Sequence, residues 1–305
     1  CHASEPELAR QLGRLERWTN KRFRRLRGQL EQRRRQGAIR ECHGDMHRGN
    51  IVILAAEPVI FDCIDFNPSL RWIDTISEVA FLTMDLAEAG EHALARRLLN
   101  RYLEVTGDYA GMPLLRFYQV YRALVRAKAS AIELIQQQAS DCEHSRPFAS
   151  ICHYLALARA CSGRHRPQLF ITHGLSGSGK TWLGHLLREH LPLIQLRSDI
   201  ERKRLFGVPE QQRPQAHQSR QLYSSAATER TYRRLLELAD GLISAGFSVL
   251  VDATFLTQAQ RAPFLALAEQ RCCPCRILVP EAPVAVLRDR VRNRYGERED
   301  ASDAD

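Results

Sequence analysis

The apolar residues of the first forty positions recur at roughly helical spacing, a pattern that predicts one or two helices there. Two short apolar runs follow, residues 51–54 and 58–61, and the three residues between them indicate a β-hairpin. From residue 73 to about residue 160 the helical period returns, for instance between Leu114 and Ile135. The first half of the chain is therefore expected to be mostly α-helical.

The pattern changes after a polar segment, Cys161 to Pro167. Beyond this segment, short apolar runs alternate with helical stretches. The expected strands are residues 169–171, 193–196, 247–251 and 276–279, and the expected helices between them are 182–190 and 223–245. Strands that alternate with helices indicate a parallel sheet covered on both faces. We place the boundary of two domains in the polar segment, which gives residues 1–165 and 166–305.

Length, composition and charge agree with two globular domains. The chain has 305 residues, 44% of them hydrophobic, and its net charge of +9 comes from 44 Lys and Arg against 35 Asp and Glu. Clustered cations near the start could bind nucleic acid, but the helical spacing of the apolar residues favours a solvated helix face for them. These residues are Lys21, Arg22, Arg24, Arg25, Arg27, Arg33, Arg34 and Arg35.

The nine cysteines are an odd number without a regular framework, which favours a reducing compartment, by default the cytoplasm. The tightest cluster, Cys272, Cys273 and Cys275, has no second pair at zinc spacing, so buried or incidental thiols are expected. No apolar run approaches the roughly 20 residues of a spanning helix, so a soluble protein is expected. Because the chain begins with Cys1 rather than Met, we expect a fragment, with room for an upstream targeting signal.

The strongest chemical signal is the run Gly-Leu-Ser-Gly-Ser-Gly-Lys-Thr at residues 174–181. The backbone N–H groups of such a glycine-rich turn, placed between a strand and a helix, can hold phosphate oxygens. Lys180 would reach the β- and γ-phosphates, and the Thr181 hydroxyl would bind magnesium. A dinucleotide-binding turn does not fit, because Gly-x-Gly-x-x-Gly is not completed. The sequence predicts an ATP or GTP site with magnesium, with nucleotide contacts from Gly174, Ser176, Gly177, Ser178, Gly179, Lys180 and Thr181.

Charged residues that follow the next strands suggest an acceptor site. Asp199 could orient or deprotonate an acceptor hydroxyl while Arg202 anchors an anionic group, and a helix N-cap beside a solvated basic turn is an equal alternative. Asp252 ends an apolar strand, as a second magnesium carboxylate would. Arg288 and Arg292, with Arg294, could close over the phosphates and stabilise the charge in transfer, or could form a plain solvated helix face.

The order of these elements, with Ser-Asp-x-x-Arg and Asp-Ala-Thr, resembles the small-molecule and polynucleotide kinase branch of P-loop proteins, which includes zeta-toxin-like kinases. The resemblance implies ATP-dependent phosphoryl transfer to a hydroxyl. Such a domain usually has one more strand and helix after the point where this sequence stops, so we expect its C-terminal end to be truncated.

A second motif lies in the first half. Residues 43–50 read His-Gly-Asp-Met-His-Arg-Gly-Asn, and His-x-Asp with Asn five residues after the Asp is the spacing of a protein-kinase catalytic loop. Asp45 would accept or orient the acceptor's hydroxyl proton, and Asn50 would hold magnesium. A second metal-binding carboxylate follows the hairpin, and both Asp62 and Asp65 are candidates.

This stretch resembles the aminoglycoside phosphotransferase family over roughly residues 35–140, and Asp74 and Glu78 look like the start of that family's next helix. The resemblance implies the mostly helical C-lobe of a protein-kinase-like fold. Nothing upstream matches the small lobe with its glycine-rich loop and ATP-binding lysine, so half a site is expected in this fragment. The order of the two halves resembles bacterial fused proteins with an aminoglycoside-phosphotransferase-like domain followed by an AAA-type or P-loop kinase-like domain.

The sequence thus predicts an α/β protein, a helical C-lobe followed by a P-loop domain with a parallel sheet. The leading hypothesis is an ATP-binding, magnesium-dependent phosphotransferase that acts on a hydroxyl of a small molecule, without a membrane partner. A kinase of nucleic acids, supported by the positive charge, and a non-catalytic regulatory ATP-binding module remain alternatives. The resemblance does not supply the acceptor.

Overall fold

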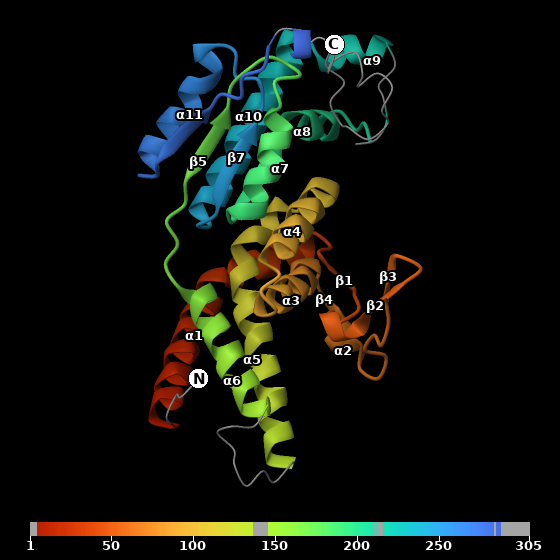
Figure 1. The fold of residues 1–305 in the computed structure, drawn as a ribbon, viewed down its shortest axis with the longest axis vertical. Helices are drawn as coiled ribbons and strands as arrows, with labels where there is room; N and C mark the ends of the chain where they lie inside the picture. The colour runs from red at the N-terminus through yellow and green to blue at the C-terminus, as the bar shows by residue number, and fades with distance from the viewer. Residues whose placement is uncertain (1–4, 137–145, 210–211, 213–215, 284, 288–305) are drawn as a thin grey trace. The chain divides into compact units, whose positions relative to one another are not determined.

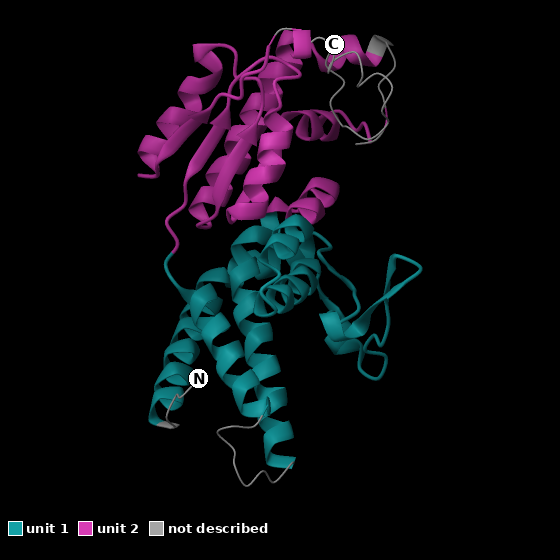
Figure 2. Cartoon of the chain, in the orientation of Figure 1, with its two compact units in different colours: residues 1–99, 110–164 teal, residues 100–109, 165–305 magenta. Residues whose placement is uncertain are grey.

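The computed structural model describes residues 5–136, 146–209, 212, 216–283 and 285–287 (Figure 1). The chain divides into two compact units, residues 1–99 with 110–164 and residues 100–109 with 165–305 (Figure 2). The C-terminal half of one helix, α4 (His92–Thr106), therefore groups with the second unit although it lies in the first half of the sequence.

The first half of the chain is mainly helical, as the sequence predicts. Its helices are α1 (Glu5–Arg35), η1 (Arg48–Asn50), α2 (Pro68–Arg71), α3 (Thr75–Glu88), α4, η2 (Tyr109–Gly111), α5 (Met112–Gln136) and α6 (Arg146–Ser162). The predicted hairpin is confirmed, because β2 (Ile51–Leu54) pairs antiparallel with β3 (Glu57–Ile60). A second antiparallel pair, β1 (Ile39–Glu41) with β4 (Trp72–Asp74), was not predicted.

The core of the first unit lies between α1, α3, α5 and α6. Helix α3 begins at an N-cap, Asp74, whose carboxylate accepts from the backbone N–H of Ile76 at 3.1 Å. Buried residues at helical spacing then face the neighbouring helices. The core cluster is formed by Leu15, Phe81, Met84, Val120, Ala123, Ala127, Tyr154, Leu155 and Ala158.

The prediction that all the early cations lie on a solvated face is wrong for Arg33. Its guanidinium is buried, and Nε and Nη2 donate to the two carboxylate oxygens of Asp74, each at 2.7 Å. The ion pair ties the end of α1 to the N-cap of α3, and a buried guanidinium needs such a partner. Arg22 is half-buried and donates to the carbonyl of Pro113. The remaining six cations are exposed, as predicted.

The second half of the chain alternates strands and helices. Its elements are β5 (Leu169–Thr172), α7 (Lys180–His190), β6 (Leu193–Arg197), α8 (Ser198–Leu205), α9 (Ala216–Leu222), α10 (Ser225–Ser244), β7 (Ser248–Asp252), α11 (Gln258–Gln270) and β8 (Cys275–Leu278). The strands form one parallel sheet in the order β6-β7-β5-β8, which confirms the predicted fold class. Every residue of β5 and β6 is buried, as in parallel strands covered on both faces.

Three further predictions concern the cysteines, the lid arginines and membranes. Cys272, Cys273 and Cys275 are free thiols. Arg288, Arg292 and Arg294 lie outside the described residues. Within the described part of the chain, every helix is too short or too polar to cross a bilayer.

Candidate functional site

The glycine-rich turn connects β5 to α7. Gly179 is the N-cap of α7 with φ of 97° and no side-chain capping bond, so the first N–H groups of the helix are not satisfied by a cap. Gly174 has φ of 142°, and an added Cβ would lie 3.0 Å from the Ser178 hydroxyl oxygen. The turn therefore requires glycine, and it presents a helix N-terminus of the kind that binds anions.

Lys180 spans this turn. Its ammonium is buried and donates to the carbonyl oxygens of Leu175 at 2.7 Å and Gly174 at 3.1 Å. The Ser178 hydroxyl lies 3.5 Å from the same nitrogen, and Ser176 is half-buried on the turn. The positive charge is thus held at the phosphate-binding turn itself.

Asp252, the last residue of β7, is the buried acid of the site, with 5% of its surface exposed. Burial raises its pKa, while Arg197, a hydrogen bond with the Thr181 side chain and Lys180 act against that rise. The charge of Asp199 adds to it. Three residues that the sequence singled out separately, Thr181, Lys180 and Asp199, are therefore neighbours of this carboxylate.

A hydroxyl and a carboxylate that contact each other beside a phosphate-binding turn suit magnesium. This cation takes oxygen ligands and is usually held by one or two protein groups together with substrate phosphates and water. Clusters of three or more His, Cys, Asp or Glu side chains that could hold a metal are absent from the described residues. The pair Thr181 and Asp252 fits a magnesium site that is completed by substrate phosphates and water, and not a closed cage of protein ligands.

Two further predicted residues lie on α8. Asp199 is half-buried in the first turn of the helix, next to the end of β6. Arg202 is buried, and its Nη1 donates to the Leu222 carbonyl at 2.7 Å and lies 3.2 Å from the Thr228 hydroxyl. Its guanidinium also lies over the Tyr223 ring. Arg202 therefore holds α8 to the segment that begins α10.

A cavity of about 530 Å³ adjoins the turn. Its lining combines backbone of the turn with apolar side chains, and Trp182 in the first turn of α7 is 69% exposed. Sequence reasoning placed Trp182 only on the helix, although an aromatic residue directly after Lys-Thr was an available signal. The lining residues are Gly177, Ser178, Gly179, Trp182, Leu183, Pro280 and Glu281.

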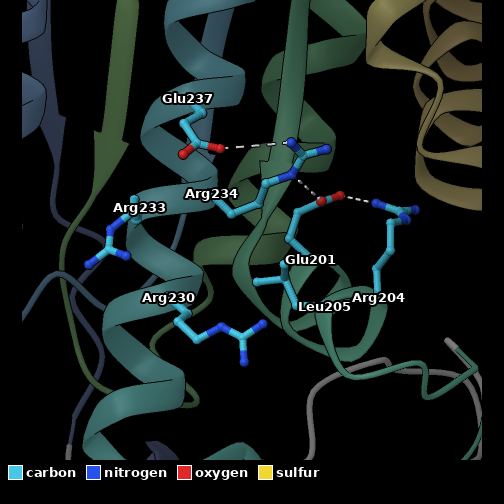
Figure 3. A pocket seen from close by; sticks show the side chains of 7 residues that line it. All are labelled: Glu201, Arg204, Leu205, Arg230, Arg233, Arg234 and Glu237. Carbon is cyan, nitrogen blue, oxygen red and sulfur yellow. Dashed lines mark hydrogen bonds and ion pairs between the residues drawn. The ribbon is translucent and has the colours of Figure 1, made fainter.

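A second cavity, of about 320 Å³, lies between α8 and α10 and is rich in arginine (Figure 3). Glu201 pairs with Arg204 and lies 3.8 Å from Arg234, and Arg233 pairs with Glu229 at 2.8 Å. Three of the four arginines thus have carboxylate partners, and we assign no ligand to this cavity. Its lining residues are Glu201, Arg204, Leu205, Arg230, Arg233, Arg234 and Glu237.

The kinase-like loop of the first unit is held together around Asp45. Asn50 donates its amide nitrogen to the Asp45 carbonyl at 3.0 Å and to the carboxylate at 3.4 Å. His47 Nε2 lies 3.4 Å from the same carboxylate, and the hydrogen bond from His47 lowers the pKa of Asp45. Because the amide nitrogen of Asn50 faces Asp45, its amide oxygen is the atom that a cation would use.

The backbone of the loop is clamped at Gly44. Its N–H donates to Glu78 at 3.1 Å, and its carbonyl accepts from Arg122 at 3.0 Å. Gly44 has φ of 85°, and an added Cβ would lie 2.8 Å from the Leu70 carbonyl oxygen. Arg122 lies 78 residues from Gly44 along the chain, so no local pattern pairs the two residues.

The two candidate metal carboxylates after the hairpin are both exposed. Asp62 has φ of 60°, and a non-glycine residue in this region is often found at a functional site. The ring of His43 lies 2.8 Å from the carbonyl oxygen of Phe61, directly before Asp62. The backbone carbonyl of Asp65 instead accepts from Arg71. The loop of residues 43–50 is thus tied to the residue that precedes Asp62.

Comparisons with known proteins match both halves. Residues 2–118 match the phosphotransferase enzyme family, and residues 169–305 match an AAA domain. Uncharacterized proteins of Mycobacterium tuberculosis and Mycobacterium bovis are each 29% identical to this chain over 276 residues, which is 88% of this chain and 53% of theirs. The chain therefore spans about half the length of the curated relatives it matches.

Among solved structures, the chain is similar to the APS kinase CysC of Mycobacterium tuberculosis in complex with AMPPNP and APS. The sequence identity is 22% and the TM-score 0.34, with 43% of this chain and 73% of that chain covered.

Proposed function

We propose that this chain is part of an ATP-binding, magnesium-dependent phosphotransferase that acts at its P-loop. The matches to the phosphotransferase enzyme family and to an AAA domain, in the predicted order, support the proposal. One observation carries the proposal. The Thr181 side chain is hydrogen-bonded to the buried Asp252 carboxylate, and the positive charge of Lys180 acts on the same carboxylate. Phosphoryl transfer asks for positioning and neutralisation of charge, and these groups supply both.

The roles follow from position. Backbone N–H groups of the turn and the first turn of α7 bind the β- and γ-phosphate oxygens, and Lys180 moves from the turn carbonyls to these oxygens. Thr181 and Asp252 would hold magnesium, which neutralises charge on the phosphates during transfer. Asp199 orients or deprotonates the acceptor hydroxyl from the end of β6. Arg288 and Arg292 remain predicted lid residues, and Arg202 a predicted anion anchor.

The cavity beside Trp182 supports a place for the nucleotide base. A flat ring can stack on an exposed indole, and the cavity opens from the same residues that bind phosphate. The acceptor is proposed to be a small molecule that carries a hydroxyl group.

The first unit supports a second, weaker proposal. Asp45 would be the group that accepts the hydroxyl proton, with Asn50 and Asp62 as metal ligands, because the carboxylate is ionised and half-exposed beside Asn50. The left-handed conformation favours Asp62 over Asp65 for this role.

The test is transfer of labelled γ-phosphate from ATP, with magnesium, to a pooled panel of sugars, aminoglycosides, nucleosides and 5′-hydroxyl oligonucleotides. Lys180→Ala is expected to lower transfer by about 10²- to 10³-fold, because it removes a cation at the developing charge. Lys203→Met is the matched control, since Lys203 is also a buried lysine of the second unit but its ammonium donates to the Gln212 carbonyl.

Label in a small molecule, lost in Lys180→Ala and retained in Lys203→Met, supports the proposal. Label only in oligonucleotides would establish a nucleic-acid kinase. Binding of ATP with no transfer to any acceptor would favour a regulatory module.

A further inference from the structure

A glutamine lies inside the parallel sheet of the second unit. Gln195 is at the centre of β6 with 1% of its surface exposed, where apolar residues are the norm. A buried amide is costly unless its hydrogen bonds are made. Its Nε2 donates to the Asp252 carboxylate at 3.0 Å, while its Oε1 makes no hydrogen bond within the described structure. The side chain is therefore committed to a single partner, Asp252.

The backbone of the same residue is held by Asn100. β6 is an edge strand of the sheet order β6-β7-β5-β8, so one side of its backbone lacks a neighbouring strand. Asn100 Oδ1 accepts from the Gln195 N–H at 2.8 Å, and Nδ2 donates to the Leu193 carbonyl at 3.1 Å. One buried side chain from residues 100–109 thus replaces the missing strand at this position.

A glycine of α7 makes room for the amide. A Cβ added at Gly184 would lie 2.2 Å from Gln195 Nε2 and 3.1 Å from the Leu250 side chain. Any larger residue at this position would have to displace the amide from Asp252. Asn100 therefore holds the Gln195 backbone, Gly184 leaves space for the Gln195 amide, and Asp252 accepts the hydrogen bond from that amide.

We propose that Gln195 is a positioning residue that holds the Asp252 carboxylate against the Thr181 hydroxyl, and that Asn100 holds Gln195. The relay runs from the Asn100 side chain to the Gln195 backbone, and from the Gln195 side chain through the Asp252 carboxylate to Thr181, so it ends at the proposed magnesium-binding pair. Gln195 acts through Asp252 and touches no substrate. The inference rests on the proposed function, because it assigns Asp252 to magnesium.

The single hydrogen bond to Asp252 has one measurable consequence. A carboxylate that can rotate binds a cation less well, and loss of an outer hydrogen-bond partner typically costs about 10- to 100-fold in metal affinity. A residue that only fills the core would leave the metal affinity unchanged.

The experiment measures binding of a fluorescent ATP analogue to the whole chain as magnesium is titrated. In Gln195→Leu, which keeps similar volume and removes the donor, the magnesium concentration for half-maximal binding should rise by about 10-fold or more. The affinity for the analogue without magnesium should stay unchanged, so that only the magnesium requirement separates the variant from wild type. Thr231→Val is the matched control, because the Thr231 hydroxyl is equally buried but bonds only to the Ala227 carbonyl of its own helix.

Gly184→Ala is the second variant, and it leaves the chemistry of Gln195 intact. Alanine favours a helix more than glycine does, so α7 itself is not weakened. The added Cβ should displace the amide and raise the magnesium requirement in the same direction as Gln195→Leu. This variant decides the matter if Gln195→Leu does not fold.

Wild-type protein that binds the analogue more tightly with magnesium, together with Gln195→Leu or Gly184→Ala that needs more magnesium, supports the relay. Variants with the same magnesium requirement as wild type and Thr231→Val would overturn it. Wild-type protein whose binding ignores magnesium would instead remove the proposed function, so the two failures are distinguishable.

Discussion

Each unit carries an aspartate for which we propose a role in phosphoryl transfer, and the two carboxylates have opposite surroundings. Asp45 has 41% of its side chain exposed, and a hydrogen bond from His47 lowers its pKa. Asp252 is buried at the end of a central strand, and burial raises its pKa. The charged form is therefore favoured at Asp45, whereas burial disfavours it at Asp252 against the opposing effect of Arg197 and Lys180.

This difference bears on the roles that we propose for the two groups. A cation favours the charged form of a buried carboxylate, as Arg197 and Lys180 do here, so the surroundings of Asp252 suit a metal ligand beside a hydroxyl and a phosphate-binding turn. An exposed carboxylate held by a histidine and an asparagine can accept a proton without a metal contact of its own. The two aspartates are therefore suited to different tasks, cation binding and proton acceptance.

The largest effect is expected from removal of the buried ion pair between Arg33 and Asp74, which should destabilise the first unit and not the second. Arg33→Met leaves the Asp74 carboxylate buried without its guanidinium, and breaking such a pair costs about 3–5 kcal/mol. Amide hydrogen exchange of α3 should accelerate by on the order of 10²- to 10³-fold, since each 1.4 kcal/mol is about tenfold. Binding of ATP at the P-loop should be retained.

Arg10→Met is the matched control, because Arg10 lies on the same helix and its pair with Glu7 is exposed. Surface pairs contribute about 0–1 kcal/mol, so exchange of α3 should not change. Equal exchange in the Arg33 and Arg10 variants would show that the buried pair does not hold α3.

A smaller effect is expected at the loop of residues 43–50. Gly44→Ala places a Cβ 2.8 Å from the Leu70 carbonyl in a left-handed backbone, and such strain costs about 1–3 kcal/mol. Gly37→Ala separates backbone strain from the steric clash, because Gly37 also has a positive φ, 76°, but has open space around it. We expect a larger loss of melting temperature for Gly44→Ala, and P-loop activity unchanged in both. Equal losses would contradict the clamp at Gly44.

The smallest effect is a pair of opposite pH dependences. The folded-state pKa of Asp252 is raised, so its contribution to stability is fully present below the ordinary aspartate value and is lost as pH rises through the folded pKa. The folded-state pKa of Asp45 is lowered, so its contribution is present above the ordinary value and is lost as pH falls through the folded pKa.

Melting temperatures measured across pH without magnesium or nucleotide check both signs. Asp252→Asn should remove part of the loss toward neutral pH, and Asp45→Asn should remove part of the loss at acid pH. Curves that change in the same direction for both variants would contradict the comparison.

Local patterns allowed much of this molecule to be predicted. The apolar runs at residues 169–171 and 247–251 predict strands because a buried parallel strand needs apolar residues. The glycine-rich turn is recognised from eight consecutive residues, so it needs no information from distant parts of the chain. The hairpin follows for the same reason, since its two strands are close in sequence. Periodicity predicted the long helices within a few residues.

Interactions between distant residues could not be predicted. Asn100 contacts Gln195 across 95 residues and Arg33 contacts Asp74 across 41, and no local pattern marks either pair. Helical periodicity reports one face of a helix, so it placed Arg33 among the solvated cations and did not reveal its buried partner. The short strands β1 and β4 were missed for the same reason, because each exists only through pairing with the other.

The most direct test of a magnesium-binding Asp252 is the magnesium dependence of ATP affinity in wild type, Asp252→Asn and Asp45→Asn. We expect magnesium to tighten ATP binding in wild type and Asp45→Asn, and we expect Asp252→Asn to lose most of this gain while ATP binding without magnesium remains. Full magnesium dependence in Asp252→Asn, or its loss in Asp45→Asn, would contradict the assignment of the buried aspartate to the cation.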